Sequence, residues 1–377
     1  MTPAGFLTAL VRVAAAAAGL ALVLLAVISA LRTFVLPRSS RDPITRRVFL
    51  SLRRLLEIRL HRTKDYVARD RVMALYAPAG LLLLPLVWLA LVAVGFAGIY
   101  WALGVTTPED AILLSVSSLL TLGFFPPPGV WPSLLTFVEA AIGLILIALL
   151  IAYLPTMYTA FSRRERAVTL LEVRAGSPPS AVEMLARFHR LGRLDRLQDA
   201  WVEWERWFAE IEESHTSLAM LVFFRSPNPT RAWVTASGAV LDAASLTAAA
   251  LDLPRNAQVD LCLRAGYLAL REVAAFFRIP FNAAPRPDDP ISITRQEFDQ
   301  ACDQLAAAGL PLKHDRAQAW RDFAGWRVNY DSVLLDLARL TMAPPGVPWS
   351  TDRARTPPPQ ARSQGGATKP TEGEAAG

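Results

Sequence analysis

The chain has 377 residues, of which 53% are hydrophobic, and a formal net charge of +6. That length would suit two ordinary domains, but so apolar a composition excludes two water-soluble ones and indicates that a lipid bilayer covers part of the surface. Only two cysteines occur, Cys262 and Cys302, without a CxxC partner or a histidine at metal-ligand spacing. We therefore expect buried core residues or idle thiols there, and no metal site.

Three stretches are almost free of charge: residues 13–37, 75–104 and 134–158. Each exceeds the roughly 20 residues that span the hydrocarbon core of a bilayer. The sequence therefore predicts three transmembrane helices, the first of them within residues 1–36.

A strongly basic segment, residues 37–72, separates the first two helices. It holds eleven Arg or Lys residues against four acids, a net charge of +7 that exceeds the charge of the whole chain. For a loop between two spans, this indicates the cytoplasmic side and contact with anionic lipids, and argues against nucleic-acid binding. The same rule places Arg163, Arg164 and Arg166 in the cytoplasm. We expect a multi-pass protein of the plasma or inner membrane, with its N-terminus outside and its C-terminus cytoplasmic.

Two points about this half stay open. Residues 1–30 resemble a cleavable signal peptide, although cleavage would leave the basic segment on the outer side. Within the segment, apolar residues recur at helical spacing beside the arginines: Val48, Phe49, Leu52, Leu55, Leu56 and Leu60. Such a helix lies in the inner membrane interface or packs against the cytoplasmic domain, and the sequence does not separate the two.

Residues 106–129 lie between the second and third spans. Thr107 is a helix cap, Pro108 suits the first helical position, and Glu109 and Asp110 suit the positive end of the helix dipole. A short helix should follow and end near Gly123, which tolerates backbone angles that other residues resist. Irregular backbone at membrane depth is stable only when it is buried in protein or lines water, so the segment predicts a re-entrant pore helix and loop.

Here the chain resembles the potassium channel superfamily, in its bacterial form with two helices flanking one pore loop. Family members carry a run such as S-aromatic-x-TLTTVGYGD, and residues 115–126 read SVSSLLTLGFFP. Matching or conservative positions are Ser115, Ser118, Leu119, Thr121, Leu122, Gly123 and Phe124. The third span resembles the family's inner helix, with Glu139, Gly143 and Ala148 before the arginine-rich exit. The resemblance covers residues 75–166.

The resemblance implies a homotetramer around one axial pathway and a permeant monovalent cation, potassium in the family. Thr121, Leu122, Gly123 and Phe124 would line the selectivity filter. Three residues depart from the pattern: Leu120 replaces a threonine, Phe125 the second glycine and Pro126 the acid. Phenylalanine is costly at the positive φ that glycine tolerates, so potassium selectivity is not carried over.

Three residues of the third helix have candidate roles. An intramembrane carboxylate is a functional-site hypothesis by default, and Glu139 is expected to brace the pore helix through Ser115 or Ser118, the alternative being that it reaches the outer interface. Gly143 and Pro155 are candidates for a hinge or gate, although both residue types are common in membrane helices.

The second half predicts a helical cytoplasmic domain over residues 167–342 and a disordered tail over 343–377. Amphipathic helices are expected at 180–191, 196–217, 259–277 and 295–308. Trp201, Trp204, Phe208 and Ile211 form a helical stripe typical of a core. His189, His215 and His314 are scattered, and no phosphate loop or nucleophile elbow occurs, so we predict no enzyme.

Two functional hypotheses remain. The first is a pore module, residues 73–166, that conducts cations. The alternative is a membrane-anchored sensor or interaction protein that keeps the channel architecture without conducting, which the Phe125-Pro126 replacement motivates.

Overall fold

The computed structural model describes residues 3–34, 42–60 and 65–344. Within these ranges every regular element is a helix, and the strand-like geometry is limited to one isolated bridge between Leu251 and Leu312. The predicted all-α class is therefore confirmed. Arg38, Arg41, Arg62 and Lys64 of the basic segment, and residues 345–377 of the expected tail, lie outside the described residues.

The N-terminal half contains α1 (Pro3–Phe34), α2 (Pro43–Leu60), α3 (Tyr66–Ala74), α4 (Tyr76–Ala102), α5 (Pro108–Leu119) and α6 (Val130–Ala175). The C-terminal half contains α7 (Ala181–Arg190), η1 (Leu194–Arg196), α8 (Leu197–Ser217), η2 (Ala219–Phe223), α9 (Trp233–Ala249), α10 (Ala257–Phe276), α11 (Arg295–Ala307), α12 (Arg316–Arg327) and α13 (Asp331–Thr341).

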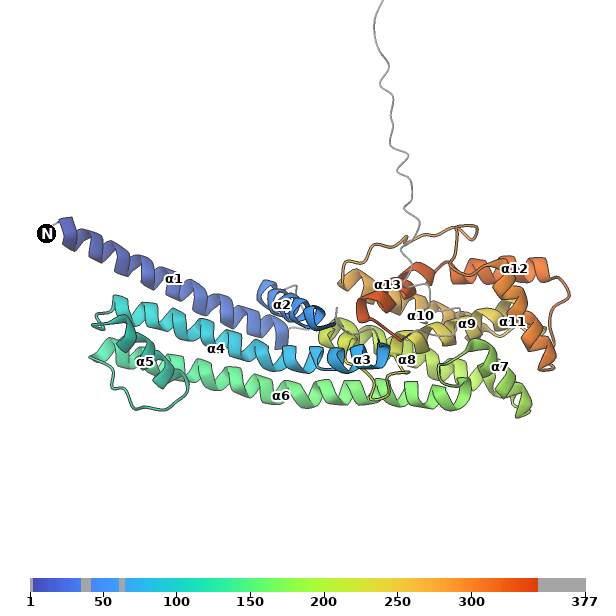
Figure 1. Ribbon diagram of the computed structural model, residues 1–377, viewed down its shortest axis with the longest axis horizontal. Helices are drawn as coiled ribbons and strands as arrows, with labels where there is room; N and C mark the ends of the chain where they lie inside the picture. The colour runs from blue at the N-terminus through green and yellow to red at the C-terminus, as the bar shows by residue number, and fades with distance from the viewer. Residues whose placement is uncertain (1–2, 35–41, 61–64, 345–377) are drawn as a thin grey trace, which may run out of the picture.

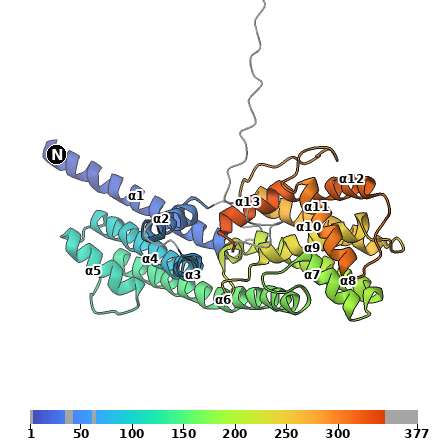
Figure 2. The same ribbon diagram turned by 45° about the vertical axis from the view of Figure 1, so that its right-hand side comes forward.

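The molecule is elongated, with α1 and α4 in one half, the α7–α13 helices gathered at the other end, and α6 running along both (Figure 1). Three helical stretches are long and apolar enough to cross a bilayer: Phe6–Phe34, Tyr66–Ala102 and Val130–Ala175. Each of them overlaps one of the three predicted spans. The short helix α5 lies beside α4 and α6, at the end of the molecule that is remote from the C-terminal helices. The turned view shows the same arrangement (Figure 2).

Helix α6 is much longer than the sequence suggests. It is continuous for 46 residues, so both the predicted end of the third span at Tyr158 and the domain boundary after Arg166 fall inside it. Arginine is a strong helix former, and the Arg163–Arg166 cluster therefore ends the apolar stretch without ending the helix. The helix stops at Gly176, which has a φ of 80°.

Helices α1 and α4 pack with their backbones in contact. A Cβ atom on Gly19 would overlap the carbonyl oxygen of Gly95, and one on Gly95 would overlap that of Gly19. Small residues of this kind let membrane helices approach closely. Below the glycines, the Trp88 indole donates to Ser29 Oγ at 2.8 Å, and Ser29 donates to Asp42 at 2.6 Å. Helix α1 is thus closely packed against α4.

The amphipathic helix α2 packs against α4 through Phe49. This side chain is buried over Gly80 of α4, where any Cβ would overlap its ring, and its ring meets Tyr76 edge-on at 5.8 Å. On the opposite face, Leu55 and Ile58 are 64% and 68% exposed beside further exposed arginines. Helix α2 therefore packs mainly against α4, with further contacts to α1 and α3.

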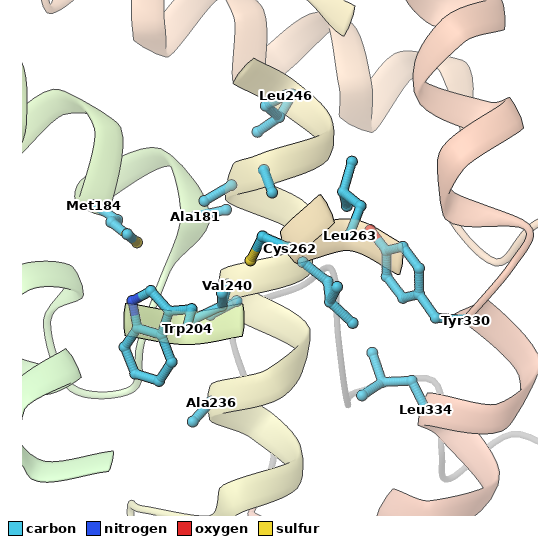
Figure 3. Packing of buried hydrophobic residues seen from close by; sticks show 14 of the residues in the cluster. Ala181, Met184, Trp204, Ala236, Val240, Leu246, Cys262, Leu263, Tyr330 and Leu334 are labelled. Atoms are coloured by element: carbon cyan, nitrogen blue, oxygen red, sulfur yellow. The ribbon is translucent and has the colours of Figure 1, made fainter. Parts of the chain in front are cut away.

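The C-terminal helices surround a single core. Trp201, Trp204, Phe208 and Ile211 are all at most 1% exposed, which confirms the predicted stripe. Both cysteines are core residues as expected, and Cys262 lies between Val240 of α9 and Leu263 (Figure 3). Helix α9 at the centre was not singled out from the sequence. Nearly every residue in it is buried, so it lacks the one-sided pattern of an amphipathic helix.

One charge network lies inside this core. The Arg327 guanidinium is fully buried and bonds the carboxylates of Asp242 and Asp331, the latter at 2.8 Å. Tyr330 donates to Asp242 at 2.8 Å, and Ser292 donates to Asp331 at 2.6 Å. Each buried charge is thus paired and hydrogen-bonded, as charges in an apolar interior must be.

A buried histidine makes the stability of this half depend on pH. His215 is fully buried, and burial lowers its pKa well below the ordinary 6.5, with the nearby Arg164 lowering it further. Below pH 6.5 the unfolded chain binds a proton that the folded chain does not, so the free energy of unfolding should fall with pH by up to about 1.4 kcal/mol per pH unit. Above pH 6.5 this contribution is constant.

Urea unfolding of the full-length protein between pH 4.5 and 8, followed by tryptophan fluorescence, checks this slope. We expect His215→Gln to flatten the slope, and the exposed His314→Gln to leave it unchanged. An unaltered slope in His215→Gln would assign the acid sensitivity to other groups.

Candidate functional site

Glu139 joins α6 to both of its neighbours. Its carboxylate is fully buried, accepts a hydrogen bond from Tyr100 of α4 at 2.7 Å, and accepts another from Ser115 of α5. Ser118, one turn further along α5, donates to the Thr136 carbonyl of α6 at 2.7 Å. The two predicted support serines therefore bond α6 one turn apart, and the buried Glu139 carboxylate contacts Ser115.

Gly143 lies where α6 crosses the end of α5. A Cβ atom at this position would overlap the carbonyl oxygen of Leu119 and crowd its side chain. The glycine is therefore explained by close packing. Pro155 is exposed within the uninterrupted helix α6.

We expect Gly143→Ala to destabilise the protein by about 1–3 kcal/mol, because the added methyl group must push α5 and α6 apart. Ala141→Val adds bulk at an exposed site on the same helix and should change the midpoint of thermal unfolding little. Equal stability of Gly143→Ala and the parent would contradict the packing role and leave the hinge prediction as the better explanation of the glycine.

Helix α5 begins as its sequence predicts. Thr107 caps it by accepting from the Asp110 amide at 3.0 Å, and Pro108 occupies the first turn. The helix has 12 residues, which corresponds to about 18 Å, less than the thickness of a bilayer core. It packs against both α4 and α6.

After α5 the backbone alternates in conformation. The φ angles are −89° at Leu120, +54° at Thr121 and +68° at Gly123, while Leu122 and Phe124 are not among the residues with positive φ. Alternation of right- and left-handed conformations aims successive N–H groups toward one side of the chain. A positive φ at a β-branched threonine is rare and strained, and such strain clusters at functional sites.

Ser117 receives these N–H groups. Its carbonyl accepts from the amides of Leu122 at 2.8 Å and Gly123 at 3.3 Å. Its hydroxyl accepts from the amides of Phe124 at 3.1 Å and Phe125 at 3.3 Å. Four consecutive amides therefore converge on one buried serine.

This convergence fixes the direction of the carbonyl groups. In a trans peptide the C=O of one residue points opposite to the N–H of the next, and the cis peptide bond of the described residues is Ser177-Pro178. The carbonyls of Thr121, Leu122, Gly123 and Phe124 consequently point away from Ser117. These are the four residues predicted to be filter-like, and all four are exposed in the single chain.

The expected strain at Phe125 is absent. The sequence suggested that Phe125 suffers at a glycine position with positive φ, but Phe125 is not among the residues with positive φ. Thr121 and Gly123 adopt the left-handed conformation instead. The alternating backbone therefore extends through Gly123 and ends before Phe125 and Pro126, two of the three positions where the chain departs from the family pattern.

The faces of α5 and α6 beside this loop are apolar and uncovered. Exposed large side chains include Ile112, Leu113, Phe137, Val138, Leu144 and Ile145. Of the three long apolar stretches, that of α6 is the least covered by the rest of the chain. No group of three metal-ligating side chains occurs among the described residues.

Comparisons with known proteins give no independent assignment: no protein-family model, curated protein or solved structure matches this chain. The site therefore stands on its own geometry. Sequence reasoning missed Ser117 and Tyr100. Three serines lie within four positions of α5, and this pattern was a signal for Ser117. No local pattern in the sequence indicates that Tyr100 pairs with Glu139.

Proposed function

We propose that the chain is one subunit of a cation-conducting pore with a potassium-channel-like loop. The single observation that carries the proposal is the convergence of four consecutive amides on Ser117, which turns the carbonyls of the exposed residues Thr121 to Phe124 away from it. Successive carbonyl oxygens directed at one axis replace the hydration shell of a permeating cation. One loop supplies only one wall of such an axis, so several copies must surround it, and four is the number in the family it resembles.

In this proposal α5 is a re-entrant pore helix. Its length is too short to span, and the backbone after it is irregular, a combination that is stable at membrane depth only against protein or water. The uncovered apolar faces of α5 and α6 are then covered by neighbouring subunits and lipid. Glu139, Ser115 and Ser118 hold α5 against α6, and Tyr100 connects both to α4.

The proposed orientation puts the N-terminus outside and the α7–α13 domain in the cytoplasm. Helix α2 supports it, because Arg46, Arg47 and Arg54 are exposed beside Leu55 and Ile58. Such a face suits the inner membrane interface, with the apolar side chains toward lipid and the guanidinium groups toward anionic phosphates.

We expect a permeant monovalent cation. The second candidate function is a non-conducting sensor or interaction protein with the same architecture. It is favoured by Pro126, which offers neither the carboxylate nor the backbone N–H of the aspartate found in the family pattern.

Purified full-length protein in planar bilayers, with opposed potassium and sodium gradients, tests the proposal. We expect cation currents that Ser117→Ala reduces or makes less selective, because two of the four amides lose their acceptor. Ser133→Ala is the matched control and should behave as the parent, because this half-buried serine near the start of α6 donates to the Gly129 carbonyl and not to the loop amides.

An intact tetramer without cation current under any gating condition would contradict conduction. The double replacement Phe125→Gly with Pro126→Asp then distinguishes the candidates. A silent parent with a conducting double variant would favour the sensor function.

A further inference from the structure

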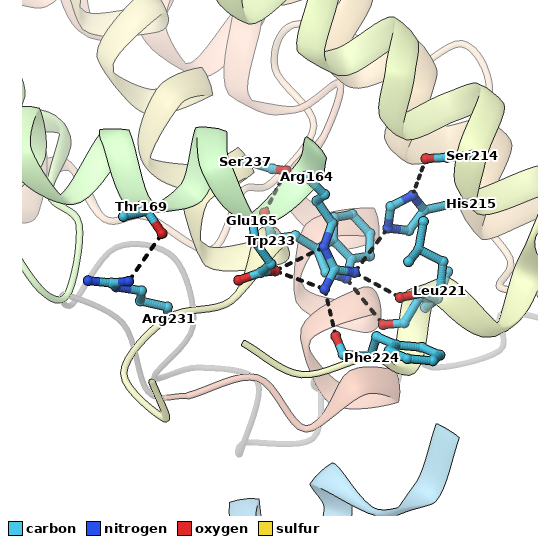
Figure 4. Close-up of polar contacts among 11 residues, drawn as sticks. Arg164, Glu165, Thr169, Ser214, His215, Leu221, Phe224, Arg231, Trp233 and Ser237 are labelled. Carbon is cyan, nitrogen blue, oxygen red and sulfur yellow. Dashed lines mark hydrogen bonds and ion pairs between the residues drawn. The ribbon is translucent and has the colours of Figure 1, made fainter. Parts of the chain in front are cut away.

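The segment from Leu218 to Arg225, which includes η2, touches elements far apart in the sequence. Toward α6 it is held by Arg164, which is only 3% exposed. The Arg164 guanidinium donates to the Leu221 carbonyl at 2.8 Å and to the Phe224 carbonyl at 2.7 Å (Figure 4). Glu165 accepts from the same guanidinium at 2.9 Å and balances its charge.

The same segment also contacts α3 and α4. Arg225 forms an ion pair with Asp70 of α3, and both side chains are about nine-tenths buried. The Phe223 ring meets Tyr76 at the start of α4 edge-on at 5.3 Å. One short stretch of chain therefore holds α6 on one side and the α3–α4 corner on the other.

The segment also contacts the C-terminal helices. Arg225 donates to the Thr341 carbonyl at the end of α13 at 2.6 Å. Trp233 of α9 donates to the Val222 carbonyl at 3.2 Å, and Phe223 packs against Phe277 after α10 at 5.5 Å. The segment is thus part of the C-terminal core, and it also binds α6 and the α3–α4 corner of the N-terminal half.

We propose that residues 218–225 form a transmission element that couples the C-terminal helical domain to the spacing between α6 and the α3–α4 corner. This is a second route beside the covalent one, in which residues 176–180 join α6 to α7. Buried, paired charges have discrete bonding arrangements, so displacing the element at one contact strains the other. The inference that this coupling acts on a gate rests on the proposed pore function. The coupling itself does not depend on that function.

A reciprocal effect between the Arg164 and Asp70 contacts distinguishes transmission from local support of the neighbouring residues. If the element transmits, a change at Arg164 must loosen the Asp70 side, and a change at Asp70 must loosen the Arg164 side. A merely local role would loosen only the residues around the altered side chain.

Hydrogen exchange of the full-length protein, read by mass spectrometry, tests this. In Arg164→Gln we expect amide exchange to accelerate by about tenfold in residues 66–80, as well as in residues 218–225. In Asp70→Asn we expect a similar acceleration in residues 161–168. Arg163→Gln changes the exposed neighbouring arginine and should alter neither region.

Acceleration confined to residues 161–168 and 218–225 in Arg164→Gln, with residues 66–80 unchanged, would overturn the proposal. If Arg164→Gln does not fold, Arg164→Lys keeps the charge but loses the geometry that bonds both carbonyls. The reciprocal Asp70→Asn experiment stands by itself. Since exchange is read without any current, a failure of coupling and a failure of conduction are distinguishable.

Discussion

Replacing Glu139 with alanine is expected to lower the free energy of unfolding by about 3–5 kcal/mol and to separate α5 from α6. The carboxylate is fully buried and is the acceptor for Tyr100 and Ser115. Its removal leaves two hydroxyl groups without that partner inside the protein and creates a cavity between three helices. Thermal unfolding of the purified protein, with the oligomer followed by size-exclusion chromatography, measures both effects.

Two variants sharpen that experiment. Glu139→Gln keeps the shape and one acceptor oxygen, so it should retain more than half of the lost stability. Glu109→Gln changes an exposed carboxylate in the first turn of α5 and should cost no more than about 1 kcal/mol. A stability of Glu139→Ala within 1 kcal/mol of the parent would mean that this carboxylate does not join the helices.

The second large effect is expected in the core of the C-terminal domain. Arg327→Ala should destabilise this domain by about 3–5 kcal/mol, because it leaves Asp242 and Asp331 buried without their cation. Burial already raises the pKa of Asp242, and Arg327 opposes that shift. In the alanine variant we therefore expect Asp242 to take up a proton at a higher pH than in the parent.

Urea unfolding followed by tryptophan fluorescence measures the loss. Arg321→Ala removes an exposed arginine from the same helix, one that is bonded to Gln318, and should change stability by less than about 0.5 kcal/mol. If the two variants were equally stable, the buried network would contribute nothing that the surrounding apolar core does not supply.

Hydropathy and charge were enough to predict the three apolar helices and the helical class. Each span is a run without charge, and this signal depends on composition alone. The ends of the helices were less predictable. The sequence marked the end of the apolar run near Tyr158, whereas the helix continues to Ala175, because the arginines that end the apolar run also favour helix.

The loop was predictable in part. The matches at Thr121 to Phe124 identified four residues whose carbonyls share one direction in the structure. The acceptor of their amides, Ser117, was not identified, because its role depends on how the chain turns back after α5. The expected strain at Phe125 was wrong for the same reason: the φ pattern follows from contacts with α5, and Thr121 takes the left-handed conformation instead.

The C-terminal domain was the least predictable part. Amphipathic helices such as α8 have a one-sided pattern, and their cores were assigned correctly from the tryptophan stripe. Helix α9 is buried on all sides and has no such pattern. The pairings Arg164–Leu221 and Asp70–Arg225 join residues 57 and 155 positions apart, and no local sequence signal reports them.

Water accessibility of Thr121 in the assembled protein tests the central claim most directly. Thr121→Cys introduces an exposed thiol, whereas the native Cys262 and Cys302 are buried and give little background. Leu24→Cys, on an exposed face of α1, reports a lipid-facing position. We predict that a charged, water-soluble methanethiosulfonate modifies Thr121→Cys but not Leu24→Cys, and that potassium ions slow the modification. A thiol at residue 121 that stays as unreactive as the one at residue 24 in an intact oligomer would contradict a water-filled axis at this loop.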